Sequence, residues 1–229
     1  MMKNLIFALV ALVCGVCGVN AGETQEILCG DKSLSYCIKH FDRQCKAKNY
    51  GACLSLGSLQ REQEQYSESK KYFELVCDKA NSKDSFQIER IDGSLGNKVP
   101  AIIAMKGACS DLAKYYYNGI GVRQDFTKAL QYNNKACDLG NGDSCAFAGI
   151  QYYYGEGTKK DLNRVIKLWT KSCELESAAG CVGLGAMYHN GIGIKQNLSK
   201  AKALFGKACD LGEQGGCDDY KELNEKGVK

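Results

Sequence analysis

The sequence predicts an all-α chain in which helical hairpins stack as a solenoid, and three observations lead to this fold class. Cys109, Cys145, Cys181 and Cys217 are each 36 residues apart, and a fixed period of this length is typical of solenoids built from helical hairpins. A Gly-x-Gly motif recurs once in each of the first three periods. The chain has a single proline among its 229 residues, which disfavours a turn-rich β-sandwich.

Each period reads as two helices joined by the Gly-x-Gly turn. The aligned units are 109–144, 145–180 and 181–216. Helix A runs from the cysteine through a tyrosine-rich stretch and ends at the first glycine, since glycine adopts the positive φ that closes a helix. Helix B then begins after a capping side chain that accepts a backbone N–H. The predicted capping residues are Asp125, Asp161 and Asn197.

The composition excludes several classes of function. Hydrophobic residues make up 45% and charged residues 24% of the chain, as in a soluble globular protein. A net charge of +4 is too small to indicate a nucleic-acid partner or a membrane-surface binder. The only histidines are His40 and His189, too few for a histidine-rich zinc enzyme. We therefore expect no metal site and no cofactor.

The first 21 residues have the pattern of a signal peptide. A short positive region precedes an apolar run from Leu5 to Val16, and Val19 and Ala21 supply the small residues that signal peptidase requires. We predict cleavage near Ala21 and a secreted or periplasmic mature protein. The run is too short to span a bilayer, and no later stretch is long enough, so no membrane span is expected.

The mature chain departs from the regular repeat in its N-terminal half. We predict an N-terminal capping hairpin region at 22–44, followed by a repeat array at 45–229. Between Cys53 and Cys77 the spacing is 24 residues rather than 28, as if the turn were four residues shorter. Between Cys77 and Cys109 it is 32 rather than eight, which indicates an insertion at about 81–104.

The cysteine spacing also predicts how the hairpins are stapled. Two of the 14 cysteines lie in the signal peptide, which leaves 12 in an oxidising compartment. Cysteines eight apart lie about 12 Å apart along one continuous helix, too far for a disulfide, so the chain must reverse between them. The repeat then selects the pairs Cys29–Cys37, Cys45–Cys53, Cys77–Cys109, Cys137–Cys145, Cys173–Cys181 and Cys209–Cys217.

These features resemble the Sel1-like repeat proteins, and among them the Helicobacter cysteine-rich protein (Hcp) family. The 36-residue unit, the cysteine pairs eight apart, and Lys-Ala-Cys-Asp-Leu-Gly at 135–140 and 207–212 carry the resemblance. It implies a right-handed superhelical solenoid of αα hairpins, stapled by disulfides, with a concave groove. Members are secreted or periplasmic and are often described as β-lactamases or penicillin-binding proteins.

The sequence itself gives little support for β-lactam hydrolysis. Ser67-Glu-Ser-Lys70 and Ser199-Lys-Ala-Lys202 match the Ser-x-x-Lys element of serine β-lactamases. About 1.5 matches are expected by chance in a chain with this many serines and lysines, so two are uninformative. Neither Ser-Asp-Asn nor Lys-Thr-Gly occurs. We assign no catalytic residue, and weak β-lactam hydrolysis remains an alternative that rests on the resemblance alone.

The favoured hypothesis is a monomer that binds a peptide or protein partner in the groove, with a cell-wall peptide or a β-lactam among the candidate ligands. In each tyrosine cluster, one ring should pack in the core and another should face the groove. Asparagine amides could bond an extended backbone there. The same residues could instead be ordinary solvent-exposed or packing positions. By analogy with tetratricopeptide geometry, the predicted groove residues are Lys114, Tyr117, Asn118, Ile150, Tyr153, Tyr154, His189 and Asn190, with Ala186 beside them.

Overall fold

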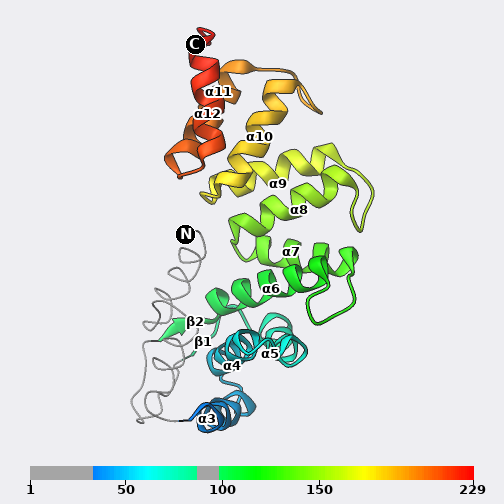
Figure 1. Cartoon of the computed structure of the whole chain (residues 1–229), viewed down its shortest axis with the longest axis vertical. Coiled ribbons are helices and arrows are strands. Elements are labelled where there is room, and N and C mark those ends of the chain that lie inside the picture. Colours follow the sequence, from blue (N-terminus) through cyan, green and yellow to red (C-terminus); the bar gives the residue numbers. More distant parts are fainter. Residues whose placement is uncertain (1–32, 87–97) are drawn as a thin grey trace. The chain divides into compact units, whose positions relative to one another are not determined.

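A computed structural model describes residues 33–86 and 98–229 (Figure 1). The predicted signal peptide and Cys29 lie outside these residues. The described part is all-α apart from two very short strands, which confirms the predicted fold class, and none of its helices is long and apolar enough to cross a membrane. The elements are α3 (Leu34–Lys46), α4 (Tyr50–Glu62), α5 (Tyr66–Lys79), β1 (Ser85–Phe86), β2 (Val99–Pro100), α6 (Ala101–Asn118), α7 (Phe126–Asp138), α8 (Gly142–Tyr154), α9 (Leu162–Glu174), α10 (Ala178–Asn190), α11 (Leu198–Asp210) and α12 (Gln214–Glu225).

The chain forms two compact units. Of the described residues, the first unit comprises those up to Tyr115 together with Gly119–Arg123. The second comprises Tyr116–Asn118 and Gln124–Lys229. In the second unit, each helix from α7 to α12 packs against the next one along the chain (Figure 1). In the first unit, α3 packs on α4 and α4 packs on α5.

The first unit contains the shortened hairpin that the spacing predicts. Helices α4 and α5 are joined by three residues, whereas seven separate α8 from α9. The middle residue of the short turn, Glu64, has a φ of 57° and so reverses the chain without glycine. The ring of Phe73 lies 2.5 Å from the position that a Cβ at Gly57 would take. This contact brings the two helices close together.

The insertion predicted at about 81–104 has regular structure at its described ends. Its described ends form β1 and β2, which pair antiparallel, with Ser85 opposite Pro100. Helix α6 already begins at Ala101, whose backbone N–H donates to the carbonyl of Asp84 at 2.8 Å. Residues 101–104 therefore form the first turn of helix α6, and residues 87–97 lie outside the described part.

The predicted helix ends and caps are present in every regular repeat. Helices α6, α8 and α10 end at Gly119, Gly155 and Gly191, with φ of 70°, 80° and 69°. The side chains of Asp125, Asp161 and Asn197 cap the following helices by accepting the backbone N–H three residues later, at 2.9–3.0 Å. The pattern that recurs from the cysteine to the turn therefore determines where helix A ends and helix B begins in each repeat.

The second glycine of the turn is required for a different reason. Gly157 has a φ of 70°, and a Cβ there would lie 2.4 Å from the backbone carbonyl carbon of Phe126. The turn after α8 thus presses against the start of α7, one repeat earlier. A side chain at this position would push the two hairpins apart.

Trp169 on α9 is the centre of the core of the second unit. Its indole Nε1 donates to the carbonyl of Ala146 at 3.1 Å. Cβ atoms at Gly149 and Gly183 would lie 2.4 Å and 2.7 Å from the indole ring, so the ring fills the space between α8 and α10. The core residues around it are Leu130, Ala146, Ala148, Tyr152, Val165, Leu184 and Met187.

Five of the six predicted cysteine pairs are bonded in the structure, with Cα–Cα distances of 4.5–5.1 Å. Cys37 is also disulfide-bonded, and its predicted partner Cys29 lies outside the described residues. The bonded pairs are Cys45–Cys53, Cys77–Cys109, Cys137–Cys145, Cys173–Cys181 and Cys209–Cys217. Disulfides persist in oxidising compartments, which indicates an extracytoplasmic protein.

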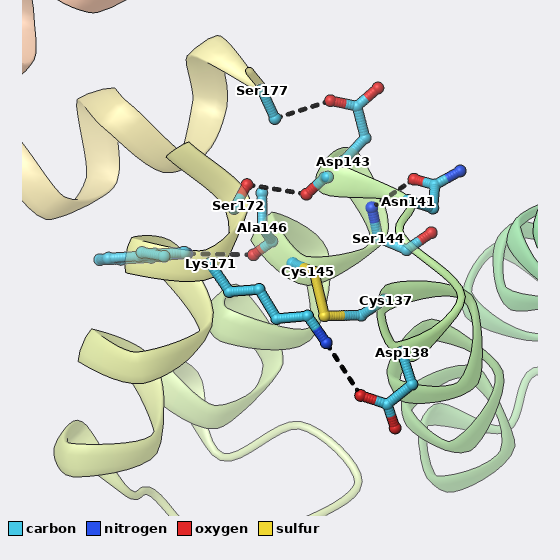
Figure 2. The surroundings of a disulfide bond; sticks show 12 residues. Cys137, Asp138, Asn141, Asp143, Ser144, Cys145, Ala146, Lys171, Ser172 and Ser177 are labelled. Carbon is cyan, nitrogen blue, oxygen red and sulfur yellow. Dashed lines mark hydrogen bonds and ion pairs between the residues drawn. A yellow bond between two sulfur atoms is a disulfide. The ribbon is translucent and has the colours of Figure 1, made fainter. Parts of the chain in front are cut away.

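Polar contacts and a small residue lie beside two of the disulfides. Around Cys137–Cys145, the Lys171 ammonium lies 3.0 Å from a carboxylate oxygen of Asp138, and the Ser177 hydroxyl donates to Asp143 at 2.7 Å (Figure 2). At the next staple, a Cβ on Gly180 would lie 2.3 Å from the Cβ of Ser172. Close approach of neighbouring helices therefore requires a small residue beside the disulfide.

Candidate functional site

The residues predicted for the groove lie on the solvent-facing sides of the A helices. In the second unit, α10 packs between α8 and α12. Residues 36 apart occupy equivalent positions on these helices and so face the same way. We call the following set the A-helix surface: Phe147, Ile150, Tyr153 and Tyr154 on α8, with Ala186, His189 and Asn190 on α10.

Helix α8 supplies the aromatic part of this surface. The ring of Tyr154 is 61% exposed, and its edge meets the ring of Tyr153 at a centroid distance of 5.1 Å. Tyr153 in turn stacks on the core ring of Trp169 at 6.0 Å. Ile150 packs half-buried against the same core. The aromatic surface is therefore supported from beneath by the centre of the fold.

Phe147 on α8 also belongs to this surface, although its sequence position did not predict it. This ring is 49% exposed and lies one turn before Ile150 and two turns before Tyr154 on the same face of α8. Its equivalents in the neighbouring repeats are Asp111 and Gly183, so no repeated pattern marks it. The helical spacing of Phe147, Ile150 and Tyr154 could have revealed the stripe.

Helix α10 places smaller and more polar groups beside that stripe. The Asn190 side-chain amide donates to the carbonyl of Ala186 at 3.0 Å, and its oxygen lies 3.2 Å from Nδ1 of His189. Asn190 is exposed at the end of the helix. These contacts use one N–H and one lone pair of the amide, which has a second of each, so a ligand backbone can bond Asn190 without displacing them.

The three groove residues predicted on α6 have different surroundings. Lys114 belongs to the first unit, where its ammonium lies 3.8 Å from Asp111. In the second unit, the Tyr117 hydroxyl donates to the Glu156 carboxylate at 3.0 Å. Burial, and then this bond and the charge of Glu156, raise the pKa of Tyr117 above its ordinary value. Asn118 is exposed at the end of α6.

The tyrosine clusters differ from the expectation of one core ring each. At 152–154, Tyr152 is buried and Tyr154 is exposed, as predicted. At 115–117, two rings are buried. The Tyr115 hydroxyl lies 3.0 Å from the Ser69 hydroxyl within the first unit, and Tyr116 stacks on Tyr132 at 5.7 Å in the second. The first cluster has two buried rings because its helix contributes to the core of both units.

A cation–π contact that was not predicted recurs at the equivalent tyrosines Tyr116, Tyr152 and Tyr188, one in each of the three repeats. Lys128 lies 5.0 Å from the ring centroid of Tyr116, and Arg164 lies 4.9 Å from that of Tyr152. Lys200 lies 5.3 Å from that of Tyr188. These basic side chains sit in the first turn of helix B, where they cover the rings instead of completing a capping box.

The lysines of the two Ser-x-x-Lys matches have structural contacts. The Lys202 ammonium donates to the Asn224 side chain at 2.9 Å and to the carbonyl of Val228 at 2.6 Å. Lys70 lies 3.5 Å from Glu74, one turn further along α5. Within residues 33–86 and 98–229, no cluster of three or more His, Cys, Asp or Glu side chains could hold a metal ion.

Comparison with known proteins identifies the repeat. The family model of the Sel1 repeat matches residues 107–141, 142–177 and 178–213. The fold is similar to that of a protective antigen from uropathogenic Escherichia coli strains that displays an SLR fold, with a TM-score of 0.66 and 20% identity over 83% of this chain and 37% of the antigen. No curated protein sequence matches the chain.

Two further solved structures are similar. A Sel1 repeat protein from Oxalobacter formigenes has a TM-score of 0.60 and 19% identity over 75% of this chain and 61% of its own. Helicobacter pylori cysteine rich protein B has a TM-score of 0.45 and 32% identity over 52% of this chain and 90% of its own. The chain thus spans 37% and 61% of the first two relatives. The chain therefore contains three Sel1 repeats, at residues 107–213.

Proposed function

We propose that this protein is a secreted or periplasmic binding module that uses the A-helix surface to hold an extended segment of a peptide or protein partner. Signal-peptide cleavage near Ala21 would release it, and it would act as a monomer. Sel1 repeats generally mediate protein–protein interactions, which agrees with this proposal. β-Lactam hydrolysis is not proposed, because no contact in the described residues favours it.

The observation that carries the proposal is the exposed apolar stripe on α8. Phe147 and Tyr154 are large rings with about half or more of their surface in solvent. A rigid aromatic group of this kind is typical of interaction surfaces, because it contributes contact area at little cost in conformational entropy. Tyr153 stacks on Trp169 and meets the edge of Tyr154, so the Tyr154 end of the stripe is packed against the core before any partner binds.

A displayed library of random peptides, selected on the oxidised mature protein, tests the proposal. Dissociation constants of the selected peptides are then measured by calorimetry for the wild type and for Phe147→Ala and Tyr154→Ala. We expect each substitution to weaken binding by about tenfold or more, as for a central aromatic contact. Leu175→Ala is the matched control, because Leu175 is also exposed but lies in the disulfide-bridged turn.

Two results would contradict the proposal. In one, the library yields no peptide that binds the oxidised protein. In the other, the selected peptides lose as much affinity with Leu175→Ala as with Tyr154→Ala, so that binding does not depend on the A-helix surface.

A further inference from the structure

Helix α12 continues the A-helix surface with a different chemistry. Cys217 follows Cys181 by one period, so α12 is the A helix of a fourth unit. On α8, three equivalent positions hold Phe147, Ile150 and Tyr153. The same positions hold Gly183, Ala186 and His189 on α10, and Asp219, Glu222 and Glu225 on α12. The surface therefore runs from aromatic to small to acidic.

Helix packing places the acidic end beside the rest of the surface. Burial raises the pKa of Asp219, and the hydrogen bond from Lys226 lowers that of Glu222. The charge of His189 on α10 is a smaller cause that lowers both pKa values. Helix α10 also packs directly against both α8 and α12. The acidic residues are therefore one helix beyond His189, and two helices beyond the aromatic stripe.

The negative charge at this end is only partly compensated within the protein. Helix α12 carries four carboxylates and one lysine. Glu222 pairs with Lys226, and Glu225 lies 3.9 Å from Lys221, but these pairs are more than half exposed. No cation in the described residues forms an ion pair with Asp219, and Glu222 and Asp218 lie close enough to repel its charge. A basic group supplied by a partner would relieve this repulsion.

We propose that the partner segment is an extended peptide with a bulky apolar side chain for the α8 stripe and an arginine or lysine for the acidic end of α12. This inference rests on the proposed function and specifies its ligand. Neighbouring helices pack about 8–10 Å apart, so the two ends are separated by about 16–20 Å. An extended chain advances about 3.3 Å per residue, which places the basic side chain about five or six residues from the apolar one.

The small residues between the two ends agree with such a ligand. Gly183 and Ala186 have little or no side chain, so a ligand can approach helix α10 closely in the middle of the surface. The Asn190 side-chain amide can then bond the ligand backbone. A strand-like segment can cross here without a large side chain in its way, with its two anchors at either side.

Synthetic peptides with blocked ends test the inference on the oxidised mature protein. One peptide places Phe and Arg six positions apart in a Gly, Ser and Asn background. Three matched peptides carry Arg→Gln, carry Phe→Ala, or keep both residues but place them next to each other. We expect the Arg→Gln and adjacent peptides to bind about fivefold more weakly than the first, as for a partly exposed ion pair. This preference should shrink at high salt.

Protein variants locate the effect. The double variant Asp219→Asn, Glu222→Gln should bind the Arg and Gln peptides equally, whereas Asp210→Asn, an exposed carboxylate at the end of helix α11, should keep the preference. If the wild type binds both peptides equally but still requires Phe, the basic specificity is wrong and peptide binding stands. If none of the peptides binds and the displayed library also yields nothing, the proposed function fails with it.

Discussion

The indole Nε1 of Trp169 lies 2.4 Å from the position that a Cβ would take at Gly149. The same nitrogen donates to the carbonyl of Ala146 at 3.1 Å, so the ring is fixed against the backbone of α8. Phe205 has the same relation to Gly185 one repeat later, with 2.7 Å between the ring and the Cβ position. In both repeats, a glycine on helix A therefore leaves the space that an aromatic ring of helix B fills.

Gly149→Ala should therefore destabilise the protein. The added methyl group overpacks the site, and we expect the free energy of unfolding to fall by about 1–3 kcal/mol. Gly107→Ala is the control, because a Cβ there would meet nothing within 4 Å. That change should stabilise helix α6 by about 0.5–1 kcal/mol. Equal effects of the two substitutions in urea titrations would contradict the packing that we describe.

The disulfides should differ in their contribution to stability. Chain entropy predicts about 2.5 kcal/mol for a bridge between cysteines eight apart and about 3.7 kcal/mol for one between cysteines 32 apart. Removal of Cys77–Cys109 by paired Cys→Ala changes should thus lower the free energy of unfolding more than removal of Cys137–Cys145. The opposite order in chemical denaturation would show that strain or residual structure outweighs loop length.

Removal of the side chain that caps α9 should lower the free energy of unfolding by a smaller amount. Asp161 accepts the backbone N–H of Arg164 at 3.0 Å. Asp161→Ala leaves this donor without its partner, and we expect a loss of about 1 kcal/mol in the free energy of unfolding. Asp161→Asn keeps the acceptor, as Asn197 does in the next repeat, and should stay near the wild type. Comparable losses in both variants would exclude the cap as the cause.

Tyr117 should make the stability of the folded protein depend on pH in the alkaline range. Its pKa is raised in the folded protein by burial first and then by Glu156. The pKa of a tyrosine in an unfolded chain is about 10. Because the pKa of Tyr117 is higher in the folded protein, the folded state holds the proton more tightly. The free energy of unfolding therefore falls as the pH rises above the unfolded value and through the folded one. Glu156→Gln should lower the pKa of Tyr117 and weaken this fall.

The pKa change can be measured by titrating the phenolate absorbance of the protein and subtracting the titration of a Tyr117→Phe variant. Glu174→Gln, which removes an exposed carboxylate at the end of α9, is the control and should leave the titration of Tyr117 in place. A Tyr117 titration that does not change with Glu156→Gln would contradict the hydrogen bond to Glu156.

The sequence predicts the helices, caps and bridges well because the 36-residue repeat shows each of them several times. Gly155 and Asp161, for example, have equivalents in both neighbouring units. Features that occur once are invisible to this comparison. Phe147 stands alone in its column, and its exposure depends on how α8 packs. The burial of Tyr115 depends on Ser69, a contact between residues 46 positions apart.

The acidic end of the surface was also not predicted, although α12 follows the repeat. Its sequence alone resembles an ordinary charged C-terminal helix. Only its contact with α10, and the interaction of His189 with Asp219 and Glu222, place these carboxylates next to the predicted groove residues. The candidate site thus depends on tertiary contacts that a single sequence does not reveal.

Peptide mapping of the oxidised protein by mass spectrometry, without reduction, tests most directly whether neighbouring hairpins are stapled in order along the chain. We expect the links Cys45–Cys53, Cys77–Cys109, Cys137–Cys145, Cys173–Cys181 and Cys209–Cys217, and also Cys29–Cys37. Free thiols at these positions, or a link such as Cys137–Cys181 between separate staples, would contradict this pairing.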